Sequence, residues 1–138
     1  MTNLFTSLNR WASGQSENFL TEAFVQLLNR LLANAPHEFD SLIGSLTRNK
    51  VKSHDGNRSD IQIRSQASTE LGSPDIEISG PNIHCFVEVK DGAPVDPDQL
   101  RRYSEVLSSR GEQTRCLVLL TRYPPPPVDE PFLVEPVR

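Results

Sequence analysis

Hydrophobic and polar positions alternate with a period of two in residues 75–79 and again in residues 84–90, on either side of Gly80-Pro81-Asn82. In the first stretch Ile76 and Ile78 share one face, and in the second the apolar face carries Cys85, Val87 and Val89. This alternation is typical of strands that place one face in a core. We therefore predict a β-hairpin that turns at residues 80–83 and has one buried face and one polar face.

Apolar residues spaced three and four apart predict helices in four other places. The strongest pattern covers residues 17–33, with Ser16 as its cap, and its apolar face carries Leu20, Ala23, Phe24, Leu27, Leu28, Leu31 and Leu32. Pro36 is expected to end this helix, and weaker patterns predict helices over residues 2–11 and 38–47. Asp96-Pro97 is a typical helix start and Gly111 a typical stop, which predicts a last helix between them.

Further stretches have the patterns of strands. Ile61 and Ile63 alternate with polar residues just before the hairpin, and the unbroken apolar run 116–120 is typical of a central strand buried on both sides. Residues 132–134, after a proline-rich segment, form either an edge strand or the opening of a further piece. A strand reached through a crossover helix lies parallel to its neighbour. The order of these helices and strands along the chain predicts an α/β fold with a mixed β-sheet flanked by helices.

Composition and charge exclude only a few classes of protein. The chain has 138 residues and a formal net charge of −4, which fits one globular domain and argues against a strongly basic coat for nucleic acid. Both cysteines lie in apolar runs, so we expect buried thiols in a reducing compartment. No run approaches the roughly 18 apolar residues of a membrane span, and no signal peptide opens the chain. We therefore expect no membrane contact and a cytoplasmic location.

The polar face of the predicted hairpin carries the candidate chemistry. A turn at residues 80–83 sets Asp75 opposite Glu88, and like charges that face each other across a strand pair are destabilising. Lys90 lies on the same face and relieves this repulsion only in part. A divalent cation would relieve it fully, and Mg²⁺ prefers one or two carboxylates together with water and substrate phosphate. The sequence therefore predicts a magnesium site at this end of the hairpin.

The helix over residues 17–33 offers a third carboxylate. Helical geometry turns Glu17 toward whatever the apolar face packs on and places Glu22 almost opposite. Two interpretations of Glu17 stay open at this point. It either supports the metal or is an acid in the first helical turn that complements the helix dipole.

Other polar residues are weaker candidates. The basic segment 48–58, which includes Lys50, Lys52 and Arg58, is either a solvated loop or a phosphate contact. Glu77 is expected to be an outer or exposed acid, and His84 is placed outside the site. The histidines and cysteines show no zinc-ligand spacing, and the chain lacks a glycine-rich phosphate loop and a nucleophile elbow.

The central pattern is Pro74-Asp75, twelve residues, then Glu88-Val89-Lys90. It resembles the signature of the PD-(D/E)XK nuclease superfamily, and the predicted order of helix, three strands, helix and strand is similar to the core of that superfamily, a restriction-endonuclease-like core. The resemblance covers roughly residues 16–121. Gln99 and Tyr103 add a match, similar to the Q-x-x-x-Y motif of the recombination-type exonuclease branch, and their spacing places them on one helix face.

The resemblance implies roles for individual residues. Asp75, Glu88 and the carbonyl of Val89 would hold Mg²⁺, or Mn²⁺ as a substitute, and Glu17 would support this metal or bind a second one. Lys90 would orient the attacking water or stabilise developing negative charge. The residues expected to contact nucleic acid are Gln99, Tyr103, Arg102, Lys50 and Lys52. The nuclease-like domain would span residues 1–123, and residues 124–138 would form a proline-rich tail or begin an edge strand.

The expected function is metal-dependent hydrolysis of DNA in defence or DNA repair, with no small-molecule cofactor and with a homodimer allowed. Restriction-type endonuclease, junction resolvase and exonuclease all remain open. Two other classes remain as alternatives. One is a non-catalytic nucleic-acid-binding module that uses basic residues such as Arg101 and Arg102, and the other is a structural subunit of a larger assembly.

Overall fold

The computed structural model describes residues 16–51, 60–66, 68–91, 94–112, 114–121 and 130–137. The helix expected over residues 2–11, Lys52 and the proline-rich segment 124–127 lie outside these ranges. The remaining predicted elements can be compared directly with the structure.

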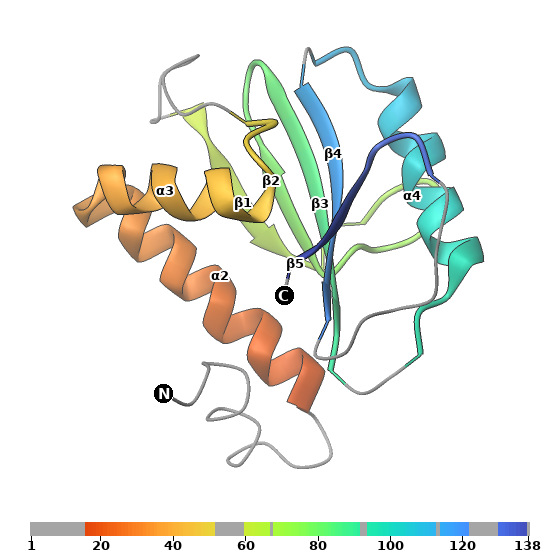
Figure 1. The fold of residues 1–138 in the computed structure, drawn as a ribbon, viewed down its shortest axis with the longest axis horizontal. Helices are drawn as coiled ribbons and strands as arrows, with labels where there is room; N and C mark the ends of the chain where they lie inside the picture. The colour runs from red at the N-terminus through yellow and green to blue at the C-terminus, as the bar shows by residue number, and fades with distance from the viewer. Residues whose placement is uncertain are drawn as a thin grey trace.

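Five strands form one sheet in chain order, and they are β1 (Gln62–Ser65), β2 (Ile76–Ser79), β3 (Ile83–Lys90), β4 (Thr114–Thr121) and β5 (Leu133–Val137). The first three strands pair antiparallel, and β4 pairs parallel with both β3 and β5 (Figure 1). The predicted mixed sheet is thus confirmed. The residues after Phe132 form the edge strand that was one of two alternatives for this stretch.

The hairpin of β2 and β3 has the predicted register. Ile76 pairs with Val87 and Ile78 with Cys85. Asp75, directly before β2, and Glu88, directly after Val87, are therefore the next positions of the same ladder. The turn segment Gly80-Pro81-Asn82 separates the strands as expected, because proline and glycine interrupt strand pairing there.

Three helices are present in the described part of the chain, namely α2 (Ser16–Asn34), α3 (Pro36–Leu46) and α4 (Pro97–Ser109). Figure 1 shows α2 and α3 on one face of the sheet and α4 on the other. Pro36 both ends α2 and occupies the first position of α3, where its fixed φ favours a helix start. Asp96 caps α4 as predicted, since its side chain accepts a 3.0 Å hydrogen bond from the Asp98 amide. No described helix is both long and apolar enough to cross a membrane.

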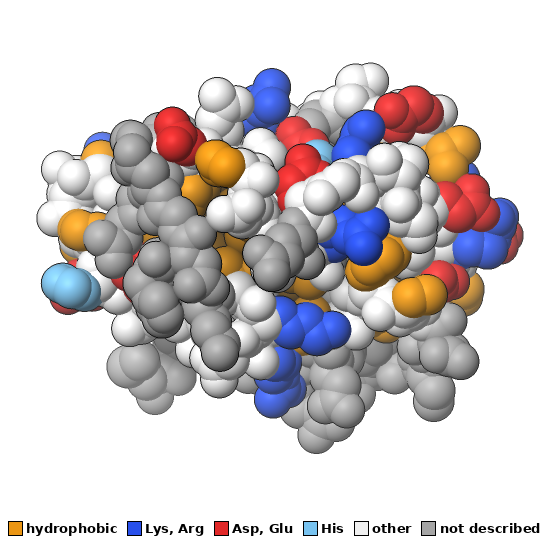
Figure 2. All heavy atoms as spheres, turned by 90° about the horizontal axis from the view of Figure 1, so that it is seen from above, with side chains coloured by type: hydrophobic (Ala, Val, Ile, Leu, Met, Phe, Trp, Pro, Cys, Tyr) orange, Lys and Arg blue, Asp and Glu red, His pale blue; other side chains and the backbone are white. Residues whose placement is uncertain are grey.

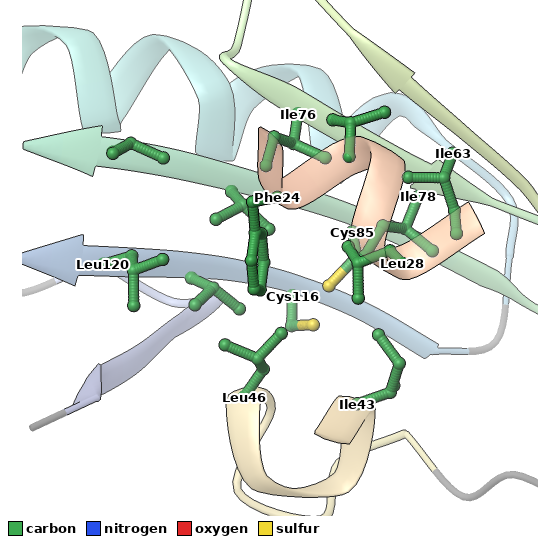
Figure 3. Close-up of a cluster of buried hydrophobic side chains, with 14 of the residues drawn as sticks. Phe24, Leu28, Ile43, Leu46, Ile63, Ile76, Ile78, Cys85, Cys116 and Leu120 are labelled. Carbon is green, nitrogen blue, oxygen red and sulfur yellow. The ribbon is translucent and has the colours of Figure 1, made fainter. Parts of the chain in front are cut away.

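The larger hydrophobic core lies between the sheet and the helices α2 and α3 (Figure 3). Phe24 and Leu28 from α2 and Ile43 and Leu46 from α3 reach the inward side chains of the strands, which include Ile63, Ile76, Ile78, Cys85 and Cys116. Cys85 and Cys116 are neighbours across β3 and β4, and both are buried free thiols, as predicted.

The opposite face of the hairpin is not the open polar face that we predicted. Phe86 is fully buried there together with Leu117 and Leu119 of β4 and with the inward face of α4, which carries Leu100, Tyr103, Val106 and Leu107. The prediction was wrong because alternation along a strand distinguishes two faces but does not reveal that a crossover helix covers the second one. Glu88 therefore lies in an interior rather than on a surface.

Candidate active site

The structure brings Asp75 and Glu88 together at the end of β3. The Asp75 carboxylate accepts a 2.7 Å hydrogen bond from the Val89 amide, which ties the start of β2 to the end of its neighbour. The Glu88 side chain is only 2 % exposed. The two acids thus face each other, and solvent hardly reaches the Glu88 side chain.

This environment changes the ionisation of Glu88. Burial first, and then the hydrogen bond and the charge of Asp75, raise the pKa of Glu88 to about 9, and the nearby Lys90 opposes this shift. No donor in the described part of the chain reaches Glu88 Oε1, which is buried. With this pKa, Glu88 keeps its proton in the metal-free protein at neutral pH, because a second ionised acid beside Asp75 would need a counter-charge.

Lys90 lies beside this pair, two residues further along β3. Its Nζ is 3.8 Å from Glu88 Oε2, and its side chain is 16 % exposed. This distance is too long for a direct hydrogen bond between the two groups. The ammonium group is therefore held near the carboxylates but keeps its donors for another acceptor.

Glu17 points toward the same end of the sheet, as the helical geometry predicted. Its Oε1 accepts a 2.9 Å hydrogen bond from the Asp91 amide, one residue beyond β3, whereas Glu22 is exposed to solvent. Glu17 thus fixes the end of β3 next to Lys90. Its predicted role as a metal ligand stays a prediction.

The residues present fit a hard divalent cation. A buried carboxylate oxygen without a donor, on Glu88, lies next to a second acid, and oxygen atoms are the ligands that Mg²⁺ takes. Within the described ranges, no group of three or more His, Cys, Asp or Glu side chains is arranged to hold a metal ion. Mg²⁺ is often held by one or two carboxylates with water and substrate oxygens, which is the set that Asp75 and Glu88 provide.

The first turns of α4 border the pair formed by Asp75 and Glu88, called the acidic pair below, from the other side. Tyr103 is buried, and its hydroxyl donates a 3.0 Å hydrogen bond to the Ser73 carbonyl. Burial and the charges of Glu88 and Asp75 raise the pKa of Tyr103. This interior position differs from the exposed one that a direct contact between Tyr103 and nucleic acid requires.

The basic residues predicted to contact nucleic acid lie in different places. Arg102 is half-buried beside Tyr103, and no described carboxylate forms an ion pair with it. Lys50 is exposed after α3, and Figure 1 shows that segment toward the end of the sheet that carries the β2–β3 turn, away from the end of β3. Seen from that turn end, Lys and Arg side chains stand among Asp and Glu side chains (Figure 2). Of these predicted nucleic-acid contacts, Arg102 is therefore the cation that lies on α4 beside Tyr103.

Family models, curated proteins and solved structures gave no match to this chain. The resemblance to a nuclease superfamily therefore depends on the motif residues and on their geometry alone.

Sequence reasoning missed a buried polar network at the other end of the hairpin. His84 Nε2 lies 2.7 Å from Glu77 Oε2, and His84 Nδ1 lies 3.3 Å from Glu112 Oε1. Arg64 adds an ion pair at 3.6 Å from Glu77. Burial opposes ionisation of Glu112, yet hydrogen bonds from its own backbone and from His84 leave its pKa below the usual value. The network thus pairs His84 with two acids. The hairpin register, which places Glu77 and His84 near each other on one face, was the available signal.

The orientation of α2 makes a prediction about its two glutamates. Glu17→Gln removes a charged acceptor from the Asp91 amide beside Lys90, so the DNA cleavage that the nuclease resemblance implies should slow by roughly 30- to 1,000-fold, equivalent to about 2–4 kcal/mol in the barrier. Glu22→Gln, on the exposed face of the same helix, is the matched control and should cleave at the wild-type rate. Single-turnover cleavage with Mg²⁺ measures both. A crippled Glu22→Gln protein with a silent Glu17→Gln change would mean that α2 does not contribute to the site in this way.

Proposed function

We propose that this protein is a metal-dependent nuclease that hydrolyses phosphodiester bonds in DNA. The observation that supports this proposal most strongly is the buried contact between Asp75 and Glu88, with Lys90 beside it. The order of the described elements, helices followed by three antiparallel strands, a helix and a parallel strand, adds support for a restriction-endonuclease-like core of the PD-(D/E)XK type.

In this proposal Asp75, Glu88 and the Val89 carbonyl hold Mg²⁺. When bound, the cation supplies charge neutralisation at the phosphate and lowers the pKa of a bound water. Lys90 keeps its ammonium donors close to Glu88, where they stabilise negative charge that develops on the substrate. Glu17 holds the backbone of Asp91 and so fixes the strand end from which Lys90 projects. Arg102 provides a positive charge for a phosphate of the substrate.

A purely structural role explains these residues less well. An ion pair between Glu88 and Lys90 on a strand surface would be ordinary and worth at most about 1 kcal/mol. Glu88 is instead in the interior against a second acid, and this arrangement lowers the stability of the protein in the absence of a cation. Acids whose pKa is strongly shifted by contact with another acid occur most often at functional sites.

The second candidate function is a non-catalytic nucleic-acid-binding or structural module on the same fold. The lack of a third clustered carboxylate within the described ranges favours this alternative. Arg101 is a weak candidate for such binding, because it is already paired with Asp98 and Glu105. Cleavage activity separates the two functions.

A cleavage panel tests the proposal. Wild-type protein should cleave at least one of linear duplex, circular duplex or single-stranded DNA in the presence of Mg²⁺ and should not do so with EDTA. Asp75→Ala should bind the same DNA without cutting it, because it lacks one of the two acids. Wild-type protein that binds DNA but cuts none of these substrates with Mg²⁺ or Mn²⁺ would favour the binding module. A matching panel of RNA substrates defines the substrate class.

A further inference from the structure

The segment 68–75 carries Asp75 into β2, and it folds largely on itself. Thr69 and Gly72 form an isolated antiparallel bridge, and the Asp75 carbonyl accepts a 2.9 Å hydrogen bond from the Gln66 amide. Before Asp75 the segment belongs to no strand of the sheet. The Gln66 bond holds the Asp75 backbone at the end of β1, and the remaining freedom of Asp75 depends on what holds residues 68–74 against the rest of the domain.

Tyr103 of α4 holds it at Ser73, two residues before Asp75. The Tyr103 ring is 1 % exposed and packs edge-on against Phe86 of β3, with ring centroids 5.9 Å apart, and its hydroxyl reaches the Ser73 carbonyl at 3.0 Å. Gly72 lies against the same ring, since a Cβ atom at Gly72 would be 3.4 Å from Tyr103 Cε1. A rigid core side chain thus fixes the backbone that leads into the acidic pair.

We propose that Tyr103 is a positioning residue of the site, whose hydroxyl holds Ser73 so that Asp75 meets the Val89 amide and Glu88. The inference rests on the proposed function, because it assigns Tyr103 a task in the same acidic pair. It differs from the sequence-based prediction of a direct contact with nucleic acid. The residue acts through Asp75 and touches no substrate.

The hydrogen bond to Ser73 uses the only proton of the Tyr103 hydroxyl. The Ser73 carbonyl can only accept, so Tyr103 donates that proton to it. Gln99 lies four residues earlier on α4, and its Oε1 atom is buried and without a partner in the described part of the chain.

Core packing alone does not require the tyrosine hydroxyl, because a phenylalanine ring would fill the same space. Tyr103→Phe therefore removes the bond to Ser73 while it keeps the ring. The loss of one hydrogen bond amounts to about 0.7–1.4 kcal/mol, which corresponds to roughly a three- to tenfold change in an equilibrium constant. We expect an effect of this size on any equilibrium that requires Asp75 in its observed position, such as the opening of the Val89 amide or the binding of Mn²⁺.

The test begins with the full chain without metal, so that its result is independent of nuclease activity. The Val89 amide, bonded to Asp75, should exchange its hydrogen roughly three- to tenfold faster in Tyr103→Phe than in wild type, as measured by NMR. Mn²⁺ affinity, measured by calorimetry, should fall by a similar factor. Glu70→Gln is the control. Glu70 lies on the same segment as Ser73, and the change removes its 3.4 Å ion pair with Arg110. It should alter neither the exchange of the Val89 amide nor the Mn²⁺ affinity.

Each outcome decides one of the two claims. Unchanged Val89 exchange and Mn²⁺ affinity in Tyr103→Phe would overturn the positioning role, even if wild type cleaves DNA. A wild type that neither binds Mn²⁺ nor cleaves DNA would refute the proposed function, and the Val89 amide would still report on Tyr103. If Tyr103→Phe fails to fold, Gly72→Ala replaces it. That change places an alanine at a φ of 144°, which residues other than glycine rarely adopt, so it disturbs the segment that Tyr103 holds and should accelerate Val89 exchange in the same way.

Discussion

Glu88→Gln is expected to raise the free energy of unfolding of the metal-free protein at alkaline pH, by something on the order of 5 kcal/mol near pH 8. In the folded wild type, burial and Asp75 raise the pKa of Glu88 from 4.5 to about 9. Between these two values the folded protein retains a proton that the unfolded chain has lost. Wild-type stability therefore falls as the pH rises through this window, and glutamine, which does not titrate, removes the fall.

Urea unfolding at several pH values between about 5 and 9 measures this difference, with the slope of the transition as a check that the folded state is unchanged. The two proteins should be closest at the acidic end and should diverge as the pH rises. Parallel stability curves would mean that Glu88 does not carry a shifted pKa. Asp75→Ala should show no such gain, because it also removes the acceptor of the Val89 amide.

Lys90→Ala is expected to lower the rate of DNA cleavage by roughly 100- to 1,000-fold, the usual effect of removing one preorganised stabilising group. Mn²⁺ binding should remain measurable, because lysine is not a ligand in the proposed site. Its affinity should weaken only slightly, since Lys90 lowers the pKa of Glu88 and so favours the ionised carboxylate. Calorimetry and single-turnover cleavage separate these two effects.

Arg30→Ala is a suitable control for Lys90→Ala, because it removes an exposed positive charge from α2. That variant should bind Mn²⁺ and cleave DNA as the wild type does. If Lys90→Ala and Glu88→Ala lose Mn²⁺ affinity to the same extent, the division of roles between a ligand and a charge-stabilising lysine is wrong.

The local elements could be predicted because their causes are local. The segment Gly80-Pro81-Asn82 fixes the turn, and the period of two on each side fixes the register, so the meeting of Asp75 and Glu88 followed from the sequence. The parallel pairing of β4 followed from the crossover helix before it. The cap at Asp96 and the inward side of Glu17 followed from helix geometry.

The burial of the second hairpin face could not be predicted in the same way. Phe86 in the middle of that face was the hint, but one apolar residue does not distinguish an exposed aromatic from a second core. The pKa of Glu88 depends on α4 covering that face. Its shift is therefore a tertiary effect that no local pattern encodes.

The same limit applies to Tyr103 and to His84. Helical spacing placed Tyr103 on the face of Gln99, but its role depends on a backbone carbonyl 30 residues away in sequence. His84 is satisfied by Glu112, which follows α4 and reaches it only when the helix has packed. Polar residues under a covering helix find partners that sequence neighbours do not reveal.

The most direct test of the central claim is DNA cleavage in water enriched in ¹⁸O, with wild type and Glu88→Gln purified in parallel. Wild type with Mg²⁺ should give cut ends whose terminal phosphates carry ¹⁸O from the attacking water, and EDTA should stop the reaction. Glu88→Gln, although folded and more stable than wild type at alkaline pH, should give no product. Equal cleavage by the two proteins, or no ¹⁸O in the phosphates of the wild-type product, would contradict a hydrolytic site built on Asp75 and Glu88.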